Sequence, residues 1–246
     1  TAIVVKTLKG LFLTMRTPTR SSDQSLAQQA FEAFRDLLAC GQIRSGQMIS
    51  ISELVEVTGL PLAPVREAVK RAAAAGLVSI LPQRGVLILE TTAEALHAGF
   101  HLRYLFDQEG ARLLAQQAPD RELAHLRQEH ERVLEQASEG AISAQLQIKA
   151  MELDWSLHGW LTGALNNPVA LAVYEENRYR LSVMQHSRRP LPERIIPAMT
   201  EHLQIIDHIQ TGAPEKAVQA VRSHLQKTLR WWGIVDNNGQ VFKTAR

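Results

Sequence analysis

An almost unbroken helical pattern fills the second half of the sequence, and it constrains the fold more than any other feature. From Thr91 onward, apolar residues recur at the spacing of one helix face. The breaks are short and contain Pro, Gly or Asn, at Pro119, Gly140, Asn166-Asn167-Pro168, Pro190 with Pro192, and Gly212-Ala213-Pro214. We expect helices at 92–118, 120–138, 142–165, 168–187, 193–211 and 214–233, packed as a bundle with short connections.

The N-terminal part has shorter elements. Residues 25–39 have helical spacing up to Gly41, and a short second helix, capped by Ser50 or Ser52, follows. A break at 58–61 precedes a third helix, which accepts Pro64 in its first turn and ends at Gly76. Two β-branched runs, at 77–81 and 86–89, flank a turn at 82–85 and indicate a hairpin. This order predicts a winged helix-turn-helix.

The expected fold is therefore mostly α, with an N-terminal winged helix-turn-helix (three helices plus a β-hairpin wing) and a C-terminal all-α helical bundle. We divide the chain into a flexible basic arm at 1–22, a DNA-binding domain at 23–90, a helical domain at 91–235 and a tail at 236–246. Residues 1–90 hold ten Lys and Arg against seven Asp and Glu, whereas the rest holds 17 against 18. This asymmetry mildly favours a nucleic-acid surface in the N-terminal part.

Cysteine usage and hydropathy indicate the compartment. Cys40 is the only cysteine, so the chain has no disulfide framework and no thiolate zinc cluster, as expected in a reducing cytoplasm. No apolar stretch reaches the roughly 18–20 residues of a membrane span. The opening residues lack the longer apolar core and the cleavage site of a signal peptide. We expect a cytoplasmic protein with no membrane partner.

Four residues in the helical half have the spacing of a metal site. Asp154 and His158 are four apart on one helix and share a face. His202 and His224 are each about eleven residues from the turn at 212–214, so in an antiparallel pair they sit at the same height. Three imidazoles and a carboxylate suit zinc, nickel, iron or manganese. Chance also produces such spacing among nine histidines, and a second pair, His97 and His101, is assigned no role.

The winged-helix segment resembles the GntR family of bacterial regulators over about residues 25–90. The motifs that carry the resemblance are Leu37-Leu38-Ala39-Cys40-Gly41-Gln42-Ile43-Arg44-Ser45-Gly46, Pro64-Val65-Arg66-Glu67-Ala68-Val69, Ala75-Gly76-Leu77-Val78 and Pro82-Gln83-Arg84-Gly85. One departure is that Pro61, Leu62 and Ala63 replace the Ser-Arg-Thr that commonly precedes Pro-Val-Arg-Glu. An arginine and two hydroxyl groups that could contact DNA are therefore missing.

Five residues are candidate DNA contacts. Arg66 on the third helix offers a planar fork to guanine or to a phosphate. Arg84 and Gly85 at the hairpin tip bring positive charge and bare backbone close to the duplex. Lys70 and Arg71 can reach phosphates. For each cation the alternative is a solvated charge on the surface.

Residues 98–225 resemble the helical ligand-binding domain of the FadR branch of this family, called FCD. The matching segments are Leu102-Arg103 with Asp107 and Glu109, Asp154-Trp155-Ser156-Leu157-His158 with Asn167, Glu201-His202 with Ile205, and Val221-Arg222-Ser223-His224-Leu225. Many members bind a metal through an Asp, the His four residues later and two further histidines. The resemblance therefore implies a divalent ion at Asp154, His158, His202 and His224, with zinc or nickel placed before iron or manganese.

The resemblance also implies a small effector in the helical domain. Arg103 would face the cavity and clamp an anion, or it forms a surface salt bridge with Asp107 at the i,i+4 spacing. Asn177, Arg178 and Arg180 are further candidates for effector contacts.

We therefore expect a homodimeric transcriptional regulator that reads an inverted repeat in double-stranded DNA and responds to a carboxylate or sugar acid. Two alternatives come from other classes. The helical domain could be a metal-dependent enzyme of hydrolase type, although the sequence has no HExxH motif. The winged helix could instead be a protein-interaction module.

Overall fold

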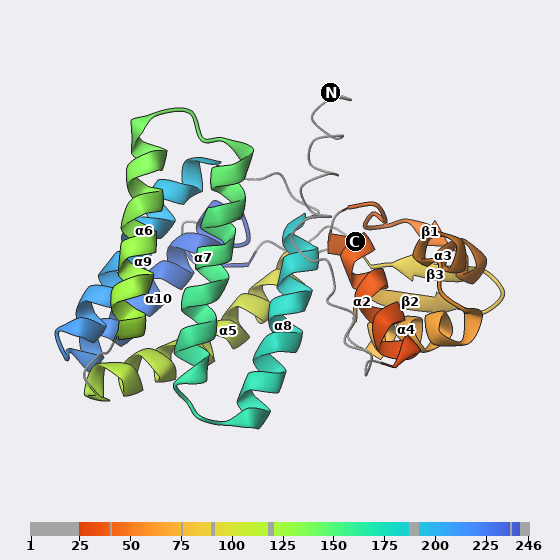
Figure 1. The fold of residues 1–246 in the computed structure, drawn as a ribbon, viewed down its shortest axis with the longest axis horizontal. Coiled ribbons are helices and arrows are strands. Elements are labelled where there is room, and N and C mark those ends of the chain that lie inside the picture. The colour runs from red at the N-terminus through yellow and green to blue at the C-terminus, as the bar shows by residue number, and fades with distance from the viewer. Residues whose placement is uncertain are drawn as a thin grey trace. The chain divides into compact units, whose positions relative to one another are not determined.

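The computed structural model describes residues 25–39, 41–74, 76–89, 92–117, 121–186, 192–236 and 238–241. The chain divides into two compact units, one built mainly from residues 1–91 and the other mainly from residues 92–246. In Figure 1 the first unit combines short helices with a small sheet, and the second is made of helices. Among the described residues, no helix combines the length and the apolar character that a bilayer crossing requires. The expected basic arm at 1–22 lies outside the described residues.

The first unit is a winged helix-turn-helix, which confirms the expected fold class. Its elements are α2 (Leu26–Ala39), β1 (Met48–Ile49), α3 (Ile51–Thr58), α4 (Leu62–Ala74), β2 (Val78–Leu81) and β3 (Gly85–Ile88). The three strands form an antiparallel sheet in the order β1-β3-β2. Strand β1 was not expected, because two residues are too short to produce a readable alternation.

Local sequence signals explain where α3 begins and ends. Ser50 accepts a hydrogen bond from the backbone N–H of Glu53, whose side chain accepts one from the backbone N–H of Ser50. This capping box satisfies two backbone donors at the start of the helix. Gly59 follows with φ 67°, a left-handed conformation that favours glycine at a helix end. The apolar faces of the three helices pack on one core with Phe31, Phe34, Leu54, Val65 and Val86.

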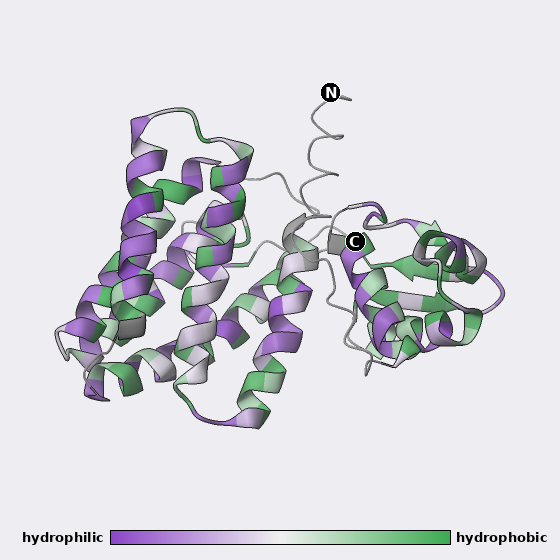
Figure 2. Ribbon diagram, in the orientation of Figure 1, coloured by the Kyte–Doolittle hydropathy of each residue, from purple (hydrophilic) through white to green (hydrophobic). Residues whose placement is uncertain are grey.

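The second unit is the expected all-helical bundle. Its elements are α5 (Ala93–Gln117), α6 (Arg121–Glu139), α7 (Ala144–Gly163), α8 (Pro168–His186), the 3-10 turn η1 (Pro192–Arg194), α9 (Ile195–Gln210) and α10 (Pro214–Trp231). The helix expected to begin at residue 193 is split, because a 3-10 turn precedes α9. Helix α5 packs against α7, α9 and α10, and α6 packs against α7 and α9. In Figure 2 the visible side of α6 is largely hydrophilic, as expected for an outer helix.

Helices α5 and α7 run parallel in a fixed register. Arg103 pairs with Asp154, and Asp107 pairs with His158. One turn further on, a Cβ at Gly110 would collide with the carbonyl oxygen of Leu161. Each of these three pairs spans 51 residues, as the Arg103–Asp154 hydrogen bond does. The absence of a side chain at Gly110 therefore allows the close helix crossing that aligns the polar pairs.

Candidate functional site

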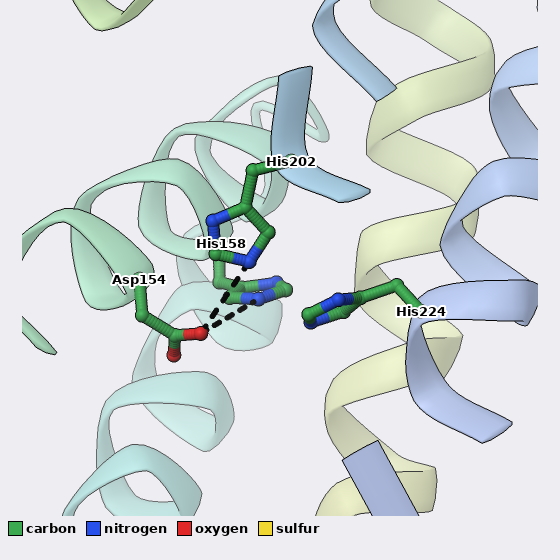
Figure 3. A group of neighbouring side chains, drawn as sticks. All are labelled: Asp154, His158, His202 and His224. Carbon is green, nitrogen blue, oxygen red and sulfur yellow. Dashed lines mark ion pairs between the residues drawn. The ribbon is translucent and has the colours of Figure 1, made fainter. Parts of the chain in front are cut away.

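Four side chains from three helices converge inside the bundle. Asp154 and His158 come from α7, His202 from α9 and His224 from α10, and each offers one ligand atom within 4.8 Å of the other three (Figure 3). The three histidines are almost completely buried, with exposed fractions of 0%, 0% and 3%. All four residues that the spacing singled out therefore lie together.

The chain reaches this arrangement through two simple geometries. The i,i+4 spacing puts Asp154 and His158 on one face of α7. Helices α9 and α10 form a hairpin around Gly212, whose φ of 63° favours glycine, and Pro214 opens α10 in its first turn. His202 and His224 lie on either side of that turn, with ring centroids 4.7 Å apart.

Each histidine has a protein group at its Nδ1 atom. His224 Nδ1 is 2.8 Å from Oε2 of Glu201, His158 Nδ1 is 2.8 Å from Oδ2 of Asp107, and His202 Nδ1 is 3.2 Å from Nε2 of His130. The opposite ring atom, Nε2, is buried in all three and has no hydrogen-bond partner among the described residues. Buried polar atoms rarely remain without a partner, and three such atoms that converge on one point form a donor set suited to a metal ion.

Asp154 divides its two oxygens between the cluster and an arginine. Oδ1 lies 3.7 Å from Nε2 of His158 and 3.5 Å from Nε2 of His202, too long for hydrogen bonds (Figure 3). Oδ2 accepts a hydrogen bond of 3.2 Å from Nη1 of Arg103. Burial alone would raise the pKa of Asp154, but Arg103 and the neighbouring histidines hold it well below its usual range. Asp154 is therefore a carboxylate.

Burial also sets the protonation of the rings. It lowers the pKa of His158 well below the usual range and that of His224 to about 3. Both rings are therefore neutral at physiological pH, the form that binds metal ions. Burial raises the pKa of Asp107 to about 7, although Arg103 opposes this shift.

The sequence reasoning missed the roles of three residues around the cluster. Glu201 is held by Arg194 through two hydrogen bonds, of 3.0 and 2.5 Å, and both residues are buried. His130 on α6 is completely buried against His202. One signal was present for His130, because it lies at helical spacing between the buried residues Leu123 and Val133 and interrupts an apolar stripe.

The four effector candidates differ in environment. Arg103 is buried and carries ion pairs to Asp154 and Asp107, so its pair with Asp107 is internal and not on the surface. Asn177 is buried and donates to the carbonyl of Gly99. Arg178 pairs with Glu175 at 3.3 Å, and the buried Nε of Arg180 has no hydrogen-bond partner within the described ranges. Arg103 alone among these four is joined to the cluster by a described ion pair.

The DNA candidates differ in exposure and in the contacts they make within the protein. Arg66 on α4 and Arg84 in the hairpin turn are exposed, as is Lys70, which pairs with Glu67 at 2.8 Å. The guanidinium of Arg71 instead lies 4.1 Å from the ring centroid of Phe31 and donates to Gln28, so it also holds α4 against α2.

The packing of the wing strands explains why position 85 is a glycine. Its φ is 113°, and a Cβ there would lie 2.7 Å from the carbonyl oxygen of Ile49 in β1. The close approach of β1 and β3 therefore requires glycine at this position, whether or not DNA is bound.

Comparison with known proteins identifies the families that share this architecture. Residues 26–88 match the bacterial regulatory proteins of the gntR family, and residues 98–227 match the FCD domain. The Nta operon transcriptional regulator of Aminobacter aminovorans is 31% identical over 150 residues, which cover 59% of this chain and 69% of that protein.

Two solved structures share the fold. Escherichia coli McbR/YncC aligns with a TM-score of 0.65 at 17% identity, covering 85% of this chain and 97% of that one. A putative GntR regulator from Rhodococcus sp. RHA1 aligns with a TM-score of 0.69 at 18% identity, covering 87% and 100%.

A winged helix followed by a helical bundle of the FCD type defines a DNA-binding transcriptional regulator. The chain belongs to the GntR family of bacterial regulatory proteins and carries an FCD domain. This membership confirms the resemblance identified from the motifs. It also makes the protein a regulator and not the metal-dependent enzyme that the sequence left open.

Proposed function

We propose that this regulator controls operator binding through a small organic acid held at a divalent metal ion in the FCD domain. The observation that carries the proposal is the set of three buried Nε2 atoms that have no hydrogen-bond partner in the part of the chain that the structure describes, together with the carboxylate of Asp154 beside them. The proposal assigns Asp154, His158, His202 and His224 as the metal ligands.

The donor set fits a metal ion. Two donors at about 2.0–2.2 Å from one ion, in tetrahedral directions, are about 3.4 Å apart. The two separations from Asp154 Oδ1 to the histidine nitrogens, 3.5 and 3.7 Å, are close to that value. Neutral imidazoles and a carboxylate suit zinc or nickel, with iron and manganese as alternatives. The ion would act as a Lewis acid that binds an effector oxygen.

Charge favours an anionic effector. Arg103 and Arg194 balance Asp154 and Glu201, and Asp107 contributes at most one further negative charge. A divalent ion would therefore give the centre surplus positive charge, which a carboxylate or sugar acid neutralises.

The buried hydroxyl of Tyr174 has no hydrogen-bond partner among the described residues, and it would lie 3.9 Å from a Cβ at Gly159, next to His158. It supplies a polar group for the same ligand, with Asn177, Arg178 and Arg180 as further candidates on α8.

On the DNA side, we assign residues 23–90 to operator binding and 91–235 to effector binding, with a basic arm at 1–22 and a tail at 236–246. Arg66 and Arg84 would contact bases or phosphates, and Lys70 and Arg71 phosphates, with Gly85 at the wing. A homodimer in the cytoplasm would read an inverted repeat, because twofold protein symmetry requires twofold DNA symmetry.

The metal assignment is tested by a double substitution. We expect His202→Ala with His224→Ala to abolish metal retention, measured by mass spectrometry of purified protein, while the helical circular dichroism is largely preserved. The matched control is His97→Ala with His101→Ala, a second histidine pair, on α5, outside the cluster. Full metal content in the first variant would show that the site is misplaced.

The DNA assignment is tested by selecting duplexes from a random pool with metal-loaded protein at near-physiological salt. We expect an inverted repeat, which then serves as the probe for screening organic acids. On that operator, Arg66→Ala should weaken binding by about 1–3 kcal/mol if Arg66 reads a base. The control is Arg112→Ala, a half-buried arginine of the FCD domain paired with Glu109. Unchanged affinity for Arg66→Ala would remove that residue from the interface.

A further inference from the structure

The three histidines of the cluster are not oriented by the same chemistry. Carboxylates lie at Nδ1 of two of them, with Asp107 beside His158 and Glu201 beside His224. The group at Nδ1 of His202 is another imidazole, that of His130, on a different helix. His130 therefore orients its partner ring by a different chemistry from that of the two carboxyl groups.

The position of one proton follows from the contacts of His130. Its Nδ1 lies 2.6 Å from the carbonyl oxygen of Leu126, which can only accept a hydrogen bond, so Nδ1 carries the proton. The ring is completely buried, and burial disfavours a charged imidazolium. A neutral ring carries one proton, and its Nε2 therefore presents a lone pair.

The same logic then extends to His202. Nε2 of His130 can only accept, and the atom 3.2 Å away is Nδ1 of His202, which must donate. Nδ1 of His202 therefore holds a proton, which leaves Nε2 as the ring atom able to bind a metal ion. That Nε2 faces the cluster, where it is buried and has no hydrogen-bond partner among the residues described.

We propose that His130 is a positioning residue that holds His202 in the tautomer and ring orientation required to bind the metal. The inference rests on the proposed metal centre. The contacts run from the carbonyl of Leu126 through His130 to His202, whose Nε2 would hold the metal ion. His202 is thus the one ligand of the three histidines whose Nδ1 lies against an imidazole and not against a carboxyl group.

Two substitutions separate positioning from simple packing. His130→Gln keeps an acceptor oxygen near the position of Nε2, whereas His130→Phe fills the space without an acceptor. We expect His130→Phe to lower metal affinity by about 10–100-fold, and His130→Gln to restore most of it, in a chelator competition with zinc. His125→Phe, an exposed histidine on the same helix, is the control and should match the wild type.

A second measurement needs no metal. In ¹⁵N-labelled, metal-free protein, NMR of the imidazole nitrogens should give His202 a proton on Nδ1, and His130→Phe should convert this into a mixture of tautomers. Equal loss of affinity in the Gln and Phe variants, or wild-type affinity and an unchanged His202 tautomer in the Phe variant, would overturn the role. A wild-type protein that binds no zinc refutes the metal centre instead, while the tautomer measurement still tests His130.

Discussion

Glu201 is the most heavily engaged carboxylate near the cluster. It accepts hydrogen bonds from both terminal nitrogens of Arg194 and from Nδ1 of His224, and Lys227 lies 3.7 Å away. Burial alone would raise the pKa of Glu201, but the hydrogen bonds from His224 and Arg194 lower it to about 2. Glu201 is therefore a charged carboxylate inside the protein, and Arg194 helps to stabilise that charge.

Substitution of Arg194 should lower the stability of the protein. We expect Arg194→Met to lower the free energy of unfolding by about 3–5 kcal/mol, because it leaves a buried carboxylate without its main partner. The measurement is urea denaturation of metal-free protein. Arg132→Met breaks an exposed i,i+3 pair with Glu129 and should cost no more than about 1 kcal/mol. Similar values for the two variants would contradict the buried-pair interpretation.

Spacing within one helix or one hairpin was enough to find the four cluster residues. The supporting groups were out of reach, because the contact between His130 and His202 joins residues 72 apart through the register of α6 on α9. For Arg103 the sequence offered an effector clamp or a surface pair, and the structure gives a buried bridge between two carboxylates.

At the scale of elements, the parallel register of α5 and α7 fixes the polar pairs beside the cluster. Gly110 permits this register, because a Cβ there would collide with the backbone of α7. Overpacked contacts between helices typically cost about 1–3 kcal/mol, and a clash with backbone is relieved only by moving a helix.

Gly110→Ala should therefore separate α5 from α7, with a loss of about 1–3 kcal/mol or more in the free energy of unfolding and weaker metal binding. Thermal unfolding and zinc competition are the measurements. Gly163→Ala, at the exposed end of α7 with no atom within 4 Å of the new Cβ, should be neutral or stabilising by up to about 1 kcal/mol. Equal behaviour of the two variants would disprove the crossing argument.

Helices were the elements that the sequence predicted best. Their periodicity is local, and Pro, Gly and Asn mark their ends. Strand β1 could not be found in the same way, because Met48–Ile49 is defined only by pairing with β3, almost forty residues later. The sequence did not separate the 3-10 turn η1 from α9, because three residues, Pro-Glu-Arg, are too few to show a periodicity of their own.

At the scale of the whole chain, each of the two compact units has its own buried core, and the proposed metal ligands lie in the second. A ligand that binds only the folded state stabilises the unit that contains its site. A bound metal ion should therefore stabilise the helical unit against unfolding and leave the stability of the winged helix unchanged.

We expect zinc at a hundred times its dissociation constant to stabilise the helical unit by about 2.7 kcal/mol, and to leave the winged helix unchanged. Calorimetry with zinc and with a chelator measures this difference. The variant with alanine at both His202 and His224 is the control and should show no response. A zinc-dependent shift in that variant, or in the winged-helix transition alone, would place the metal elsewhere.

The α9–α10 hairpin also has a consequence for the order of folding. His202 and His224 are separated by 22 positions around a tight turn, whereas His158 lies more than forty positions earlier. Closing a short loop costs less entropy, and local contacts form faster. We expect the hairpin to assemble first and to offer a two-histidine half-site to an incoming ion, before α7 docks and completes the set. Docking of α7 onto the ion-bound hairpin would then be a late step in folding.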